Sequence, residues 1–202
     1  MRTVREASAQ PAPSAQRSPA HATGVATRRL VLAALFAGLT AVLAYVRIPL
    51  PFTPVPVPGQ TFGVMLSGLL LGPRWGATAQ AVYLLLGVVG LPVFAGGNAG
   101  PGVLLGTTGG YLVSYPLAAA VTGAIAGQRR TPGFGRALLA CVIGGIAVVY
   151  ALGVPWFMVS TGQAWREALM AAALPFVPGD LLKAVVASLL GQHVLRALGR
   201  RP

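Results

Sequence analysis

The chain has 202 residues, of which 55% are hydrophobic and only 9% are charged, and its mean hydropathy is +0.73. Soluble domains carry about 25% charged residues, so this composition excludes a soluble globular protein and indicates an integral membrane protein of one domain. The single cysteine, Cys141, excludes a disulfide framework and a cysteine-based metal site. The net charge of +12 does not indicate nucleic-acid binding, because the sequence shows no basic face interleaved with aromatic residues. Nucleic acid is therefore not an expected partner.

Residues 1–27 form a segment rich in Ala, Ser, Pro, Gln and Arg, with almost no large apolar side chains. Such a segment cannot bury enough surface to offset its chain entropy, so we predict a disordered basic tail on the cytoplasmic side. A targeting peptide is the alternative, but no apolar stretch with a small-residue cleavage site follows. The remaining residues, 28–202, form the predicted membrane domain.

Apolar runs separated by proline, glycine or arginine predict an all-α membrane domain of six transmembrane helices. The expected helices cover residues 30–46, 61–72, 75–93, 103–126, 137–159 and 180–198. Three irregular segments lie between them: five prolines at residues 49–58, a glycine-rich loop at 95–102, and residues 160–179.

The distribution of Lys and Arg predicts the orientation of these helices. Twelve of the fifteen lie on the side of the two termini, whereas Arg47 and Arg166 lie on the opposite side and Lys183 lies within the last helix. By the positive-inside rule, both termini are cytoplasmic and the three irregular segments face outward. Irregular backbone at membrane depth is tolerated only where it is buried or lines a cavity, so these segments predict an outward-facing cavity. Ordinary surface turns are the alternative.

Asp180 and Lys183 are three residues apart and share one face of the last helix. An ionisable residue within a transmembrane segment costs about 2.5 to 3.5 kcal/mol by insertion scales, and it marks a candidate functional site. The alternative is a self-neutralising pair in which Asp180 also caps the helix.

Asn98 lies in the glycine-rich loop, and its side chain offers both a donor and an acceptor. Facing Asp180 and Lys183, it would suit a neutral polar head group such as an amide or a ureide. A flexible turn is the alternative, since no Lys-Ser/Thr pair of a phosphate-binding loop follows. Tyr111 opens the fourth helix, where it either lines the cavity or anchors the helix at the membrane interface.

Ala33, Ala37 and Ala41 recur at every fourth position of the first helix. Small residues at this spacing let another helix approach closely, and that helix is either internal or part of a second subunit. No catalytic set, metal-ligand cluster or nucleotide-binding motif occurs in the sequence, so we expect neither enzymatic activity nor a cofactor.

Four motifs, in this order, resemble the BioY family, the substrate-binding (S) components of energy-coupling-factor (ECF) transporters for biotin. They are LLLGPRWG at 69–76, YLLLGVVGLPVFAGG at 83–97, LGTTGGY at 105–111 and PFVPGDLLK at 175–183. The resemblance covers about residues 28 to 197. It implies a six-helix S-component fold in a prokaryotic plasma membrane, which captures biotin at the outer face.

By position, the resemblance implies that three side chains hold the bicyclic ureido head of biotin: Asn98, Asp180 and Lys183. Gly96 and Gly97 match the loop around it. Gln60 and Tyr111 sit in matching motifs and are further candidate substrate-binding residues. No residue is assigned to the biotin carboxylate.

The resemblance also implies three partner subunits, a transmembrane coupling subunit and two ATPases, with the alanine face of the first helix as the docking surface. Rival interpretations are an S component for another vitamin, such as thiamine or riboflavin, and a self-sufficient facilitator or channel. A structural or enzyme-like membrane protein is the third, and the missing acid–base cluster argues against its enzymatic form.

Overall fold

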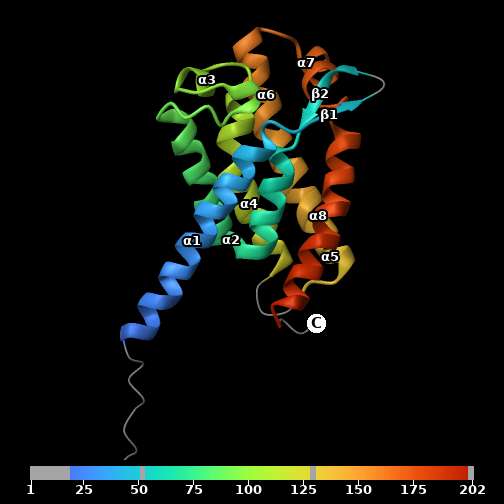
Figure 1. Ribbon diagram of the computed structural model, residues 1–202. Helices are drawn as coiled ribbons and strands as arrows, with labels where there is room; N and C mark the ends of the chain where they lie inside the picture. Colours follow the sequence, from blue (N-terminus) through green and yellow to red (C-terminus); the bar gives the residue numbers. More distant parts are fainter. Residues whose placement is uncertain (1–18, 51–52, 128–130, 200–202) are drawn as a thin grey trace, which may run out of the picture.

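The computed structural model of the chain describes residues 19–50, 53–127 and 131–199 (Figure 1). Helices dominate it. In chain order the elements are α1 (Pro19–Leu43), β1 (Arg47–Leu50), β2 (Thr53–Pro58), α2 (Gln60–Val88), η1 (Ala95–Gly97), α3 (Gly102–Leu105), α4 (Gly109–Ala126), α5 (Phe134–Val142), η2 (Ile143–Val148), α6 (Val149–Thr161), α7 (Trp165–Ala172) and α8 (Val177–Ala197).

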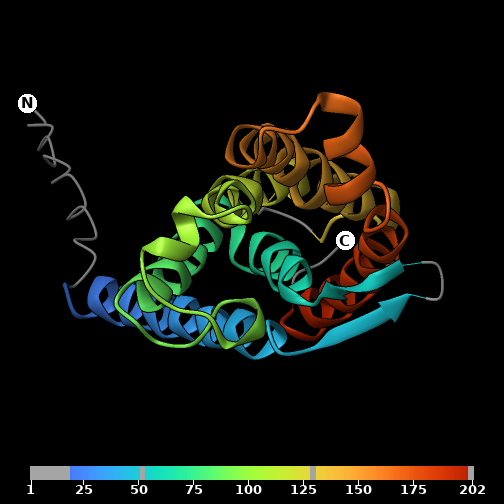
Figure 2. The ribbon, with the colours of Figure 1, turned by 90° about the horizontal axis from the view of Figure 1, so that it is seen from above.

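The two ends of the helical bundle differ in composition and structure. One end holds the start of α1, the turn inside α2, the start of α5 and the end of α8 (Figure 1). Arg74, Arg136 and Arg196 belong to these segments. The opposite end holds the β1–β2 hairpin, α3 and α7. From above, α6 and α7 lie on the side of the bundle opposite α1 (Figure 2).

Helix α1 begins at Pro19, well before the predicted start at residue 30. Residues 19–27 are thus helical in the structure, where the sequence predicted a disordered tail, and residues 1–18 lie outside the described residues. Alanines recur through this segment, and alanine has the highest helix propensity. Since the apolar part of α1 supplies the nucleus, extending the helix toward the N-terminus adds one hydrogen bond per residue ordered.

Helix α2 is a helical hairpin. Its regular backbone breaks at Gly72, with φ 80° and ψ −178°, and Pro73 follows at once. The two arms run side by side, because Gln60 of the first donates to Tyr83 of the second, and Gln80 donates to Ser67. This break divides the chain where the second and third predicted helices meet.

The proline-rich segment forms an antiparallel hairpin, where the sequence predicted an irregular loop. Arg47 pairs with Pro58, Ile48 with Val57 and Leu50 with Thr53, with an irregularity between Ile48 and Leu50. Successive N–H groups of a strand point to opposite edges. Prolines at every second position of β2 therefore remove N–H groups from one edge and leave the intervening residues free to pair.

Two other predicted segments differ in detail. The fourth predicted helix, 103–126, is split into α3 and α4 because the backbone is extended at Gly106. Residues 160–179 contain α7, which the sequence predicted as irregular. The fifth predicted helix is continuous from α5 through α6, with η2 forming a π-helical turn between them.

Three helical stretches of the described chain are long and apolar enough to cross a membrane: 26–43, 109–126 and 134–161. A fourth is counted if α7 and α8, bent by 51° at a short break, form one span. Each arm of α2 is shorter than the 18 residues that this criterion requires. The number of six crossings and the side on which the termini lie therefore remain predictions.

Glycines let α4 approach the turn of α2 closely. A Cβ atom placed on Gly123 would lie 2.5 Å from the Gly72 carbonyl carbon and from the Pro73 nitrogen. A Cβ on Gly68 would lie 2.6 Å from the Ala119 carbonyl oxygen. Backbone atoms cannot move aside as a flexible side chain can, so the α2–α4 contact requires glycine at both positions.

We predict that Gly123→Ala lowers the free energy of unfolding by about 2 kcal/mol, as expected for an overpacked contact, or roughly 4 to 8 °C in Tm. Gly38→Ala is the matched control, since among the described residues no atom outside its own helix backbone and its chain neighbours lies within 4 Å of the added Cβ. Thermal unfolding of both purified variants in detergent is the measurement. Equal melting temperatures for the two variants would contradict close α2–α4 packing.

Candidate ligand-binding site

A cavity of about 340 Å³ lies among α2, α4, α6, α7, α8 and the loop after α2. Its wall is mostly apolar and aromatic, with contributions from Phe94, Tyr111, Tyr115, Phe157 and Phe176. Charged and amide groups line it at Gln60, Asn98, Asp180 and Lys183. Apolar walls with a few converging polar groups are typical of small-molecule sites. The sequence-based prediction of a cavity at this end of the bundle agrees with the structure.

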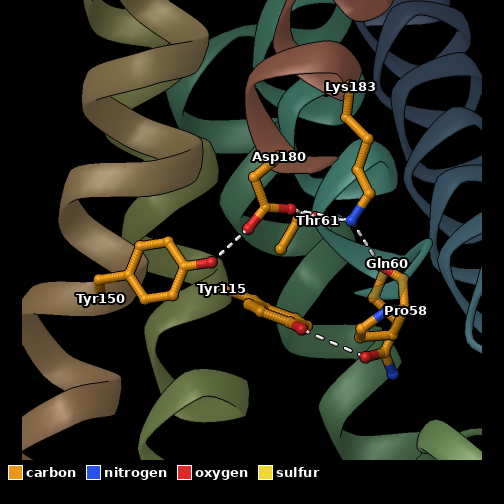
Figure 3. A network of polar contacts seen from close by, with 7 residues as sticks. All are labelled: Pro58, Gln60, Thr61, Tyr115, Tyr150, Asp180 and Lys183. Atoms are coloured by element: carbon orange, nitrogen blue, oxygen red, sulfur yellow. Dashed lines mark hydrogen bonds and ion pairs between the residues drawn. The ribbon is translucent and has the colours of Figure 1, made fainter. Parts of the chain in front are cut away.

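Asp180 and Lys183 form an ion pair inside the protein, with Nζ 2.8 Å from Oδ1 (Figure 3). The two residues are only 3% and 5% exposed. They lie in the first two turns of α8, where a spacing of three residues places both side chains on the face toward the cavity. Two opposite charges removed from water must be satisfied by neighbouring groups, and the surrounding network does this.

Each charged atom of the pair has additional partners (Figure 3). Lys183 Nζ also donates to the Pro58 carbonyl at 2.6 Å and to Thr61 Oγ1 at 3.0 Å, so all three ammonium N–H groups are engaged. Asp180 Oδ1 accepts from Thr61 at 2.8 Å, and Oδ2 accepts from Tyr150 at 2.6 Å. The network therefore joins α8 to the start of α2 and to α6.

A second polar chain lies on the same cavity wall. Gln60 Nε2 donates to Tyr83 Oη at 2.5 Å, and Gln60 Oε1 accepts from Tyr115 at 3.3 Å. Tyr83 donates in turn to the Val93 carbonyl at 3.0 Å. Gln60 is buried, and both ends of its amide are fixed in orientation. This predicted site residue therefore lines the cavity and also connects α2 to α4.

Of the predicted site residues in the glycine-rich loop, one lines the cavity and two do not. Asn98 lines the cavity, and its Nδ2 donates to the Ala95 carbonyl at 2.7 Å. Gly96 and Gly97 do not belong to the lining, but they have φ values of 78° and 76°. Since only glycine adopts such angles at little cost, these two residues shape the turn that presents Asn98.

Tyr111 also lines the cavity, as one of its two predicted roles requires. Its ring packs edge-on against Tyr150, with the centroids 6.1 Å apart. Its hydroxyl donates to the Ala172 carbonyl of α7 at 2.7 Å. The phenol therefore bridges α4 and the helix on the opposite side of the cavity.

The alanine face of α1 packs inside this chain, which is one of the two possibilities that the sequence left open. Ala33 and Ala37 are buried, at 1% and 0% exposed, and Ala41 is half-buried. The same face approaches α2, since a Cβ on Gly63 would lie 2.6 Å from Thr40 Oγ1. Ala33 and Ala37 therefore do not form a free docking surface in the isolated chain. Ala34 and Gly38, each one position after a buried alanine, are small and exposed.

Sequence reasoning missed Thr61, Tyr150 and Tyr115, which complete the polar network. Thr61 directly follows a predicted site residue, but nothing in its immediate sequence indicates a contact with residue 180. Tyr150 and Tyr115 lie within long apolar helices, where a tyrosine is as readily explained as a packing residue. These contacts join positions 30 to 122 residues apart, so local patterns do not indicate them.

The site combines one carboxylate and one ammonium in contact, so the pair carries no net charge. Together with the amides of Gln60 and Asn98, it offers both donors and acceptors within an otherwise apolar wall. This chemistry suits a compact neutral ligand with N–H and C=O groups. Among the residues that the structure describes, no group of three His, Cys, Asp or Glu side chains forms a metal site.

The chain is similar to known proteins along nearly its whole length. The BioY family model matches residues 14–200. The biotin transporter BioY of Rhizobium etli is 40% identical over 181 residues, which are 85% of this chain and 95% of that protein. Its counterpart from Thermotoga maritima is 41% identical over 163 residues, which are 81% of this chain and 93% of that protein.

A crystal structure of the S component for biotin from an ECF-type ABC transporter has a similar fold. The TM-score is 0.76 at 26% identity, and the match covers 86% of this chain and 93% of that one. The predicted resemblance to the family and the helical S-component fold are thereby confirmed. The comparisons leave the roles of individual site residues as predictions.

Breaking the ion pair from either side should destabilise the chain, because the remaining charge is left buried. We predict that Asp180→Asn and Lys183→Met each lower the free energy of unfolding by about 3 kcal/mol or more. The double variant should recover most of that loss, since it buries no charge. Thermal unfolding of the three variants tests this, and additive losses in the double variant would contradict a coupled pair.

Proposed function

The chain belongs to the BioY family, and on this basis we propose that it is the biotin-binding membrane component of an ECF-type uptake transporter. It captures biotin in the cavity at the end of the bundle that holds the β1–β2 hairpin. The vitamin is then delivered inward with the help of other subunits. The family consists of transport components, and the chain is not an enzyme.

The observation that carries this proposal is the buried Asp180–Lys183 pair in the cavity wall. The ureido ring of biotin is neutral and compact, with two N–H donors and one carbonyl acceptor. A carboxylate accepts from such N–H groups, and an ammonium donates to such a carbonyl. Because the pair is neutral as a whole, the ring binds without leaving a charge uncompensated.

Binding at this pair requires exchange of existing hydrogen bonds, since all three N–H groups of Lys183 are engaged in the free protein. In our proposal the ring carbonyl replaces one of these three acceptors. A ring N–H shares Asp180 Oδ2 with the hydroxyl of Tyr150. Carboxylate oxygens accept more than one hydrogen bond, so Tyr150 stays in place.

The other predicted residues have supporting roles in this proposal. Asn98 closes the polar end of the site from the loop that Gly96 and Gly97 shape. Gln60 holds the aromatic wall through Tyr83 and Tyr115, and the ring of Tyr111 borders the apolar part of the ligand. The fused rings and the aliphatic tail of biotin are largely apolar, which suits the aromatic lining.

We further propose that a transmembrane coupling subunit and two ATPases complete the transporter in a prokaryotic plasma membrane, because the sequence contains no nucleotide-binding motif. With six crossings and cytoplasmic termini, the arginine-rich end faces the ATPases and the cavity faces outward. The coupling subunit then contacts the exposed side of α1, where Ala34 and Gly38 permit close approach.

Biotin titration of the purified double variant Asp180→Asn/Lys183→Met separates binding from folding. We expect affinity to fall about a hundredfold, since two charge-assisted hydrogen bonds of about 1.5 kcal/mol each correspond to about tenfold apiece. Ser188→Ala, which alters a buried hydroxyl lower on α8, is the control and should bind like wild type. Thiamine and riboflavin serve as competitors in the same titration.

Two outcomes of this titration would overturn parts of the proposal. Wild-type affinity in a folded double variant would mean that the ion pair is purely structural. Displacement of biotin by thiamine or riboflavin at comparable concentrations would mean that the cavity does not select the ureido ring.

The docking surface is tested with Gly38→Leu, which adds a side chain to the exposed face of α1. Apart from the adjacent residues and the backbone of α1 itself, no atom of the described residues lies within 4 Å of the new Cβ, so the fold and biotin binding should be unchanged. We expect co-purification with the coupling subunit to fall at least fivefold. Gly135→Leu, equally unobstructed but on α5, should leave the complex intact. An undiminished complex with Gly38→Leu would place the interface elsewhere.

A further inference from the structure

Helix α7 and the turn after it, residues 165–176, cover one side of the cavity. Ala171, Ala172 and Phe176 of this segment belong to the cavity lining. In the chain order the segment joins α6 to α8, and it lies at the end of the bundle far from the α2 turn (Figures 1 and 2). We refer to residues 165–176 as the α7 lid.

The fully buried residues of the α7 lid are small, and of its large apolar side chains only Leu169 and Phe176 are partly buried. Ala168 and Ala172 face inward, whereas the large side chains of Trp165, Met170 and Leu174 are mostly exposed. Alanine buries little surface, so the lid gains less from apolar burial than a helix that inserts large side chains. Segments with few buried apolar contacts open at lower free energy than the core.

One side-chain hydrogen bond attaches the lid to the opposite wall. Tyr111 Oη of α4 donates to the Ala172 carbonyl at 2.7 Å. In the part of the chain that the structure describes, it is the only hydrogen bond between the lid and an element other than α8. The Ala172 carbonyl is at the C-terminus of α7, where no following helical turn supplies an intrahelical partner.

Both ends of α7 have a backbone that interrupts the helix. At one end, Gly162 has φ 71° directly after α6. At the other, α7 and α8 are bent by 51° across a short break. Such points between helices are where a hinge absorbs changes in φ and ψ. The lid is therefore a short helix between two breaks, held closed by its buried alanines, by the partly buried Leu169 and by one side-chain hydrogen bond.

We propose that the α7 lid is the gate through which the ligand reaches the cavity, and that the hydrogen bond from Tyr111 to the Ala172 carbonyl holds this gate closed. This inference rests on the proposed function, since the ligand is biotin bound in this cavity. The Tyr111 hydroxyl then acts on the rate of access rather than on affinity. Its ring borders the cavity while its polar atom is committed to α7.

The gate predicts a kinetic signature for Tyr111→Phe. Loss of one neutral hydrogen bond shifts an opening equilibrium by roughly two- to tenfold. If the lid opens more often in both the free and the bound protein, the association and dissociation rates of biotin both rise about fivefold. Their ratio changes little, so Kd stays within about twofold of wild type. Direct ligand contact by the hydroxyl predicts the reverse, a weaker Kd with an unchanged association rate.

Tyr45→Phe is the matched control, because the Tyr45 hydroxyl also donates to a backbone carbonyl, that of Pro92. That bond joins the end of α1 to the loop before Asn98, on another side of the cavity. The measurement is stopped-flow binding and exchange of labelled biotin on the full chain in lipid nanodiscs. Faster rates in Tyr111→Phe with wild-type rates in Tyr45→Phe are the expected result.

Four other results are distinguishable. Faster rates only in Tyr45→Phe would move the gate to the glycine-rich loop and overturn the proposal. Wild-type rates in both variants, or a tenfold weaker Kd in Tyr111→Phe at an unchanged association rate, would also overturn it while leaving biotin binding intact. A wild-type chain that binds no biotin would instead refute the proposed function itself.

Discussion

The burial of Asp180 and Lys183 is the constraint on which the cavity depends. Neither charge can be removed from water without partners, and α8 alone supplies only the other half of the pair. The remaining partners come from Pro58 at the end of β2, from Thr61 at the start of α2 and from Tyr150 on α6. The same hydrogen bonds that stabilise the charges therefore hold three elements in position around the cavity, and a ligand that binds there exchanges with some of them.

The cavity end of the bundle is built by more kinds of contact than the opposite end. Away from the cavity, glycines allow helices to touch through their backbones, as where Gly123 meets the turn of α2 and Gly144 meets Thr122. Such contacts deform little because no flexible side chain lies between the helices. Around the cavity, glycine contacts such as that of Gly110 with the Leu152 carbonyl oxygen are joined by side-chain hydrogen bonds, a hairpin and a lid. A closely packed end at the α2 turn, combined with a less stable α7 lid over the cavity, suits a protein that must admit and release a ligand.

The sequence predicted much of this structure where composition or spacing has one physical meaning. Gly72-Pro73 can only break a helix, and Asp180 and Lys183 at a spacing of three must share a helix face. Other features have several meanings in sequence. The part of α1 after Arg29 is apolar on all sides, so periodicity does not reveal that Ala33 and Ala37 face inward while Gly38 faces outward. The strand pairing of residues 47–58 and the contacts of Thr61 and Tyr150 depend on distant partners, which no local pattern encodes.

We have proposed that the Asp180–Lys183 pair recognises the ureido ring of biotin as a neutral unit with both donors and an acceptor. Competition of biotin with the diamine obtained by removing its ureido carbonyl tests this most directly, on the wild-type chain. The diamine keeps the sulfur ring and the tail but lacks the carbonyl and is cationic. We expect that unlabelled biotin displaces labelled biotin while the diamine does not, even at a large molar excess. Equal displacement by both compounds would show that the pair does not recognise the ureido ring.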